Sequence, residues 1–352
     1  VDDPASNVSK LLRAHKSFKM HAELGTEPGF HYLYDKAAAA AVPDAPPAAS
    51  EAQAGRIRTR GVEPWHQKHW DWKASGNFLC GGAGTGLFAF ASIAGLNGNA
   101  ILAPGLAALA LIACGLTLLM FKIGRPLRFI YVLRQPQRSW MSREAWVAGL
   151  LFPLALFALW SNHPMVLLAA AMVGLLFLFC QGMILEQSKG IPAWRNPRVI
   201  AFIMATGFAE GCGLCLILAA VRPELGAGAK PRAVARVVVA ATRSWTWRRY
   251  FNALVSDGVP TRTLEIFTAC RGWFFAVGLV LPVVLVAVGL VLPAADVALF
   301  ALAGLSVFAT GWAIKFILIT RAAYNQGFAL PHTPIRGSGL PGPAVKPGWA
   351  LP

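Results

Sequence analysis

Seven long apolar stretches constrain the fold of this chain more than any other feature of its sequence. A helix of about 20 apolar residues is long enough to cross the hydrocarbon core of a bilayer. Charged residues make up only 14% of the 352-residue chain and hydrophobic residues 56%. The stretches therefore predict an all-α integral membrane protein, with spans at residues 77–96, 100–121, 145–162, 165–185, 198–221, 272–292 and 296–320.

One further segment, RAVARVVVAATRSWTWRRYFNAL at residues 232–254, is ambiguous. Its apolar part is short, and Arg232, Arg236 and Arg243 share a helix face, which is typical of an amphipathic helix lying in the membrane interface. However, the basic connections all fall on one side of the membrane only if this segment also crosses it, and cytoplasmic connections are the ones enriched in Lys and Arg. We therefore predict an eight-transmembrane-helix bundle in the bacterial inner membrane, with both termini cytoplasmic.

The chain divides into three predicted parts. Residues 1–76 are polar and rich in Ala and Pro, without the basic start and apolar core of a cleavable signal, and form a long irregular N-terminal cytoplasmic extension. Their aromatic residues make docking on partner subunits about as good an interpretation as disorder. Residues 77–320 form the helical bundle, and residues 321–352 a C-terminal cytoplasmic tail.

The formal charge of +16 would suggest nucleic-acid binding in a soluble protein, but here the basic residues flank apolar spans and follow membrane topology. The six cysteines lie in or beside apolar segments, and their spacing supports neither a disulfide framework nor a four-thiolate cluster. None of the seven histidines lies inside a predicted span, so we expect no haem in this chain. Such a chain can handle electrons only by binding a mobile carrier beside a redox partner.

The sequence resembles a known family in three motifs: GRPLRFIYVL followed by SREAWVAGLLF, KGIPAWRNPRVIAF, and WDWKASGNFLCGGAGTGL. They look like the membrane-anchor subunit of dimethyl sulfoxide reductase-type molybdenum enzymes, within the wider NrfD and polysulfide-reductase membrane family. The resemblance covers roughly residues 64–320. The stretch GFHYLYDK and the end of the chain are similar to the branch described as phenylacetyl-CoA:acceptor oxidoreductase.

This resemblance implies an eight-helix subunit without prosthetic groups that binds ubiquinone or menaquinone. Its partners would be an iron-sulfur subunit and a molybdopterin catalytic subunit holding molybdenum or tungsten. Matched on the motif GxPxR and the Glu that follows, the quinol-site positions of the family fall on Lys122, Gly124, Arg128 and Glu144, with Lys122 in place of the family's His. Substrate oxidation, of phenylacetyl-CoA or sulfite for example, would then deliver electrons to quinone.

The basic loop MFKIGRPLRFIYVLRQPQRSWMSRE at residues 120–144 carries these positions. A quinone needs hydrogen-bond partners for its oxygens and a path for two protons, which Arg128 and Glu144 could supply. Gly124 and Pro126 would end the second helix and let the ring approach. The alternative is that the basic residues only follow topology and bind anionic lipid or a partner surface.

Glu210, in FIMATGFAEGCGL, lies near the centre of the fifth span. An acid there costs a few kcal/mol and is a functional candidate by default. It could relay protons or be a protonated, hydrogen-bonded group of the bundle. Lys315 can extend its side chain to the membrane surface, and we assign it no role.

Two other functions remain open at this point. A secondary transporter usually shows internal repeats and interrupted helices around a polar site, and the chain has no convincing repeat. A purely structural anchor would bind no quinone. If the chain is an anchor subunit, catalysis on the oxidised substrate belongs to a partner subunit, and we expect this chain to hold no metal of its own.

Overall fold

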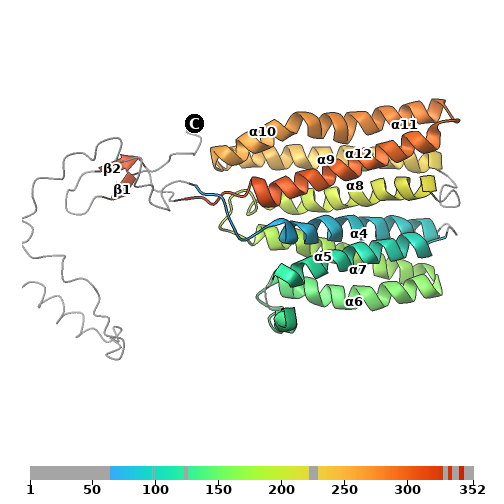
Figure 1. Ribbon diagram of the computed structural model, residues 1–352, viewed down its shortest axis with the longest axis horizontal. Coiled ribbons are helices and arrows are strands. Elements are labelled where there is room, and N and C mark those ends of the chain that lie inside the picture. The colour runs from blue at the N-terminus through green and yellow to red at the C-terminus, as the bar shows by residue number, and fades with distance from the viewer. Residues whose placement is uncertain are drawn as a thin grey trace, which may run out of the picture. The chain divides into compact units, whose positions relative to one another are not determined.

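The computed structural model describes residues 64–96, 98, 100–122, 126–221, 229–327, 332–334 and 341–344. Within these residues the chain forms a bundle of long helices that alternate in direction (Figure 1). The first five are α4 (Trp72–Leu96), α5 (Leu102–Lys122), α6 (Trp140–Ser161), α7 (Pro164–Glu186) and α8 (Arg198–Val221). The last three are α9 (Ala229–Ser256), α10 (Thr261–Phe275) running on through η5 (Ala276–Val280) into α11 (Leu281–Val291), and α12 (Asp296–Phe316) running on into η6 (Ile317–Arg321).

In the described part of the chain, three short elements lie outside these long helices. The 3-10 helix η3 (Pro126–Arg134) is part of the connection between α5 and α6. The strands β1 (His332–Pro334) and β2 (Pro341–Ala344) pair antiparallel, with His332 opposite Ala344. The described membrane-spanning part is therefore built from helices, as the apolar stretches predict.

All seven predicted apolar stretches are confirmed. Seven helices in the described part of the chain are long and apolar enough to cross a membrane. Three of them begin five or more residues earlier than predicted, at Trp72, Trp140 and Thr261. The early start of α6 has a local cause, because the Ser139 side chain accepts a hydrogen bond from the Ser142 N–H (3.4 Å) and so caps the first turn.

Helix α9 is the segment whose crossing was ambiguous. Its 28 residues extend for about 42 Å at 1.5 Å per residue, which exceeds the hydrocarbon thickness of about 30 Å. Its composition is not apolar enough to place it among the seven helices that could cross a membrane by length and composition. It nevertheless packs against α8, α10 and α11 within the bundle (Figure 1). Its Arg243 side chain is fully buried, which differs from the exposed basic face of an interfacial helix.

Close contacts between glycines hold α8 at the centre of the bundle. Gly211 of α8 meets Gly86 of α4, and Gly213 meets Gly304 of α12, so closely that a Cβ at either α8 position would overlap the facing backbone. Small residues let transmembrane helices approach backbone to backbone. The run of glycines in α4 is thus a helix-packing surface, as its position inside an apolar stretch predicts.

The substitution Gly211→Ala is expected to destabilise the folded chain by about 1–3 kcal/mol, since the added methyl group must push α4 away from α8. Thermal unfolding of the detergent-purified chain measures this effect. Gly149→Ala in α6 is the matched control, because a Cβ there meets no described atom within 4 Å. The control should change stability little or raise it by up to about 1 kcal/mol. Equal stability of the two variants would contradict the close contact.

Candidate functional site: a polar pocket at one end of the bundle

A cavity of about 270 Å³ lies where α4 and α6 begin and α5 and α7 end. Its polar lining comes from Asn77 of α4, Lys122 of α5 and Glu144 of α6. The remaining wall is almost entirely apolar and consists of Trp70, Ala74, Phe78, Leu119, Met141 and Ile184. Small-molecule sites usually measure about 300–1,000 Å³, so this cavity suits one substituted ring rather than a larger cofactor.

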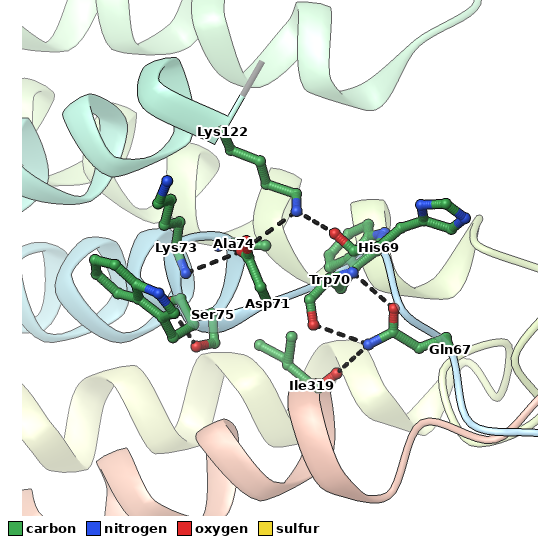
Figure 2. Close-up of polar contacts among 10 residues, drawn as sticks. Gln67, His69, Trp70, Asp71, Lys73, Ala74, Ser75, Lys122 and Ile319 are labelled. Carbon is green, nitrogen blue, oxygen red and sulfur yellow. Dashed lines mark hydrogen bonds and ion pairs between the residues drawn. The ribbon is translucent and has the colours of Figure 1, made fainter. Parts of the chain in front are cut away.

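The segment before α4 forms one wall of the pocket. The ring of Trp70 packs on Trp194 and Phe78, with centroid distances of 4.8 and 5.8 Å. The backbone N–H of Trp70 donates to Gln67 Oε1 (2.6 Å). Gln67 Nε2 donates in turn to the backbone carbonyl oxygens of Trp70 (2.8 Å) and Ile319 (3.3 Å), as Figure 2 shows. Ile319, at the C-terminal end of the bundle, therefore holds the segment before α4 in place as one wall of the pocket. The first four long helices form the rest of the pocket.

Lys122 lies at the rim of the cavity and is held by the same segment. Its ammonium group donates to the carbonyl oxygen of His69 and to Asp71 Oδ1 (3.2 Å) (Figure 2). Asp71 also caps α4, since its Oδ1 accepts from the N–H groups of Lys73 (3.1 Å) and Ala74 (3.2 Å). The pair is partly exposed, with 23% of the Lys122 side chain and 44% of the Asp71 side chain accessible.

The charge of Asp71 is maintained near neutral pH. Slight burial acts to raise its pKa, but the hydrogen bonds from the Ala74 N–H and from Lys122 outweigh this and lower the pKa below its ordinary value. Because the pKa of Asp71 is lower in the folded chain than in the unfolded chain, the ionised carboxylate stabilises the fold at any pH above the unfolded pKa. This stabilisation is lost as the pH falls through the pKa of the folded chain. Lys122 thus keeps an ionised partner throughout the physiological range.

Glu144 lies on the inner side of the cavity and is almost completely buried. Its Oε1 accepts a hydrogen bond from Asn77 Nδ2 (3.1 Å). The backbone carbonyl of Asn77 accepts in turn from Gln181 Nε2 of α7 (2.9 Å). Gly81, one turn further along α4, leaves the space that the Gln181 amide occupies. A buried carboxyl group beside an apolar cavity can exchange a proton with a bound ligand.

The structure brings two of the four predicted quinol-site residues together, because Lys122 and Glu144 both line the cavity. Gly124 and the side chain of Arg128 lie outside the described residues, although the backbone of Arg128 belongs to η3. Sequence reasoning missed Asn77. A polar residue in a run of small and apolar residues was the signal that could have found it.

Glu210, the predicted relay residue, is fully buried and forms an ion pair that the sequence did not reveal. Lys315 Nζ donates to Glu210 Oε2 (2.6 Å) and to the Phe78 carbonyl oxygen (2.7 Å). The expectation that Lys315 reaches the membrane surface is wrong, because its side chain is 0% exposed. The glycines of neighbouring helices make the room: a Cβ at Gly82 would lie 2.6 Å from Lys315 Nζ, and one at Gly311 2.6 Å from Glu210 Cγ.

Arg243 of α9 is a third buried charge. Its guanidinium donates to the carbonyl oxygens of Val307 (2.8 Å) and Gly278 (2.6 Å) and lies over the Phe274 ring, 4.9 Å from the centroid. Gly278 belongs to η5, where the π-helical geometry interrupts the regular hydrogen-bond pattern. Arg243 therefore ties α9 to both of the last two long helices.

Long apolar helices that alternate in direction, with a polar pocket at one end, define a multi-pass helical membrane protein. Residues 76–243 match the family model described as DMSO reductase anchor subunit (DmsC). Over these residues the chain is similar to that family of membrane-anchor subunits, which confirms the resemblance drawn from the motifs. The match includes Lys122, Glu144 and Glu210. Comparison with curated proteins gave no match.

Within the described residues, no group of three or more His, Cys, Asp or Glu side chains could hold a metal ion. The ionisable groups of the pocket are a cation, Lys122 of α5, and an acid, Glu144 of α6. Such a pair can bind and protonate an organic ligand with two polar ends.

Proposed function

We propose that this chain is the membrane anchor and quinone-reactive subunit of a multisubunit molybdenum or tungsten oxidoreductase. It would pass electrons between an iron-sulfur subunit, attached to a molybdopterin catalytic subunit, and the quinone pool. The observation that carries the proposal is the cavity that joins Lys122 and Glu144 at one end of the bundle. The family match supports the anchoring role.

Reduction of a quinone consumes two electrons and two protons and yields a hydroquinone. The electrons would come from the iron-sulfur cluster of the partner. The chain itself is proposed to bind the quinone as a substrate. Lys122 would donate a hydrogen bond to one quinone oxygen, and Glu144 would give up or accept a proton at the other. Trp70 and Met141 would enclose the ring. Arg128 remains a proposed further donor.

The orientation in the membrane follows from the positions of the connections. Because the long helices alternate, α4 begins and α12 ends at the same end of the bundle, provided that α9 crosses with the others (Figure 1). The basic connections at residues 122–139 and 187–197 lie at this end, and cytoplasmic connections are the basic ones. We place the pocket at the cytoplasmic face of the bacterial inner membrane, with both termini and residues 1–76 and 321–352 available for partner subunits.

This placement favours substrates found inside the cell, such as a CoA thioester or sulfite, with electron flow toward ubiquinone or menaquinone. Glu210 would serve as a proton relay for the same site. The support for this role is proximity to the pocket: Phe78 lines the cavity, and its carbonyl oxygen accepts a hydrogen bond from Lys315. Lys315 connects that carbonyl group to Glu210.

Purification of the tagged chain from its native membrane tests the proposed assembly. We expect iron, acid-labile sulfide and molybdenum or tungsten to co-purify with the chain, and the isolated particle to reduce an added quinone when given the substrate of its catalytic subunit. A chain that purifies without redox subunits would support the transporter alternative. A particle that holds these subunits but never exchanges electrons with quinone would support the purely structural anchor.

A further inference from the structure

Asn77 is a buried polar residue whose side chain is only half satisfied. Its residue surface is 1% exposed, and it lines the cavity together with Lys122 and Glu144. Its Nδ2 donates to Glu144 Oε1 (3.1 Å), whereas its Oδ1 accepts no hydrogen bond from any residue that the structure describes. An unpaired buried acceptor is costly, because it has given up its bonds to water.

The orientation of this amide is fixed by its neighbours. While Glu144 is ionised, its carboxylate can only accept hydrogen bonds, and it therefore faces the NH₂ group of Asn77. The backbone of Asn77 is held separately, because its carbonyl oxygen accepts from Gln181 Nε2 (2.9 Å). With one end of the amide bound to Glu144, its buried oxygen is left without a partner among the described residues, in a side chain that lines the cavity.

The polar groups of the cavity differ in kind. Lys122 can only donate hydrogen bonds, whereas Asn77 Oδ1 and an ionised Glu144 can only accept them. A quinone oxygen is an acceptor, so it can bond to Lys122 or to a protonated Glu144 but not to Asn77 Oδ1. A hydroquinone hydroxyl group both donates and accepts, so a hydroquinone can also satisfy the acceptor side of the cavity.

We propose that Asn77 makes the pocket selective for the reduced carrier, by accepting a hydrogen bond from a hydroquinone hydroxyl group that the oxidised quinone lacks. This inference rests on the proposed function, since it assigns a redox preference to the same site. Tighter binding of the hydroquinone makes reduction of the bound quinone more favourable, which fits the proposed flow of electrons toward quinone.

The test compares the affinities of the two redox forms. The full-length chain in detergent is titrated anaerobically with a short-chain benzoquinone and, separately, with its hydroquinone, and binding is followed by quenching of tryptophan fluorescence. The wild-type chain is expected to bind the hydroquinone about tenfold more tightly, the contribution of one buried hydrogen bond. In Asn77→Leu and Asn77→Ala, the ratio of the two affinities should fall by about the same factor.

The ratio is insensitive to partial misfolding, because misfolded chains lower the number of sites for both forms equally. The two variants remove the same oxygen but differ in volume, so a common result reports on the oxygen. Leu119→Ala enlarges the apolar wall and should change both affinities together, leaving the ratio as in wild type.

Two results would overturn the role of Asn77 while leaving the proposed function intact. One is an unchanged ratio in both Asn77 variants, and the other is a wild-type chain that binds both forms equally and loses both in Lys122→Ala. A wild-type chain that binds neither form would instead overturn the proposed function itself.

Discussion

Glu144→Gln in the assembled complex is expected to lower quinone-dependent turnover by about a hundredfold or more, the usual contribution of a general acid-base group. Glutamine has the same shape and can still accept the hydrogen bond from Asn77 Nδ2 that Glu144 receives, but it cannot carry a proton to or from the bound ring. Steady-state turnover with a soluble quinone measures the effect. Quinone binding should change far less than turnover, because the apolar wall of the cavity is preserved.

Two measurements show whether this loss belongs to the quinone site. Oxidation of the substrate with an artificial, water-soluble electron acceptor should remain at the wild-type rate, since that route bypasses the membrane subunit. Glu265→Gln supplies the matched substitution in α10, where Glu265 pairs with Arg262 on the exposed surface, and it should leave quinone turnover unchanged. A Glu144→Gln complex that assembles normally and keeps full quinone turnover would exclude Glu144 from the reaction.

Lys315→Met is expected to cost about 3–5 kcal/mol of stability, because it leaves Glu210 as a buried acid without its partner. Both side chains of this pair are 0% exposed. Methionine has nearly the length of lysine and adds no charge, so the loss reports on the ion pair more than on packing. Chemical or thermal unfolding of the purified chain in detergent provides the measurement.

The double variant Glu210→Leu with Lys315→Met distinguishes charge pairing from packing. Replacing both members of a buried pair by apolar residues is often neutral or stabilising, so the double variant should recover most of the stability lost in Lys315→Met. Lys122→Met is the comparison at a partly exposed pair and should cost at most about 1 kcal/mol. A Lys315→Met chain as stable as wild type would show that the buried pair contributes nothing to the bundle.

The number and position of the apolar helices could be predicted from the sequence, because a membrane span requires a long run of apolar residues that is visible without knowing its neighbours. Helix α9 was the exception. Its Arg243 lowers the apparent apolar character of the segment, yet in the bundle this side chain is buried against the carbonyl oxygens of Val307 and Gly278. Local composition cannot show that a distant helix supplies those partners.

The candidate site was predicted only in part. Lys122 and Glu144 came from a motif in one loop, and the structure places both on one cavity. Asn77 and Gln181 belong to other helices and meet the site only through tertiary contacts, as the bonds of Asn77 to Glu144 and Gln181 show. The four predicted quinol-site residues therefore do not form the whole polar lining.

The sequence by itself determined that this chain is a multi-pass helical membrane protein similar to the anchor-subunit family, because apolar length and family motifs are properties of contiguous residues. The tertiary structure alone decided which buried polar groups meet. Lys315 lies 105 positions from Glu210 in the chain, and the two pair only because Gly82 and Gly311 leave them space. A buried charge needs a partner, and helix packing determines which group that partner is.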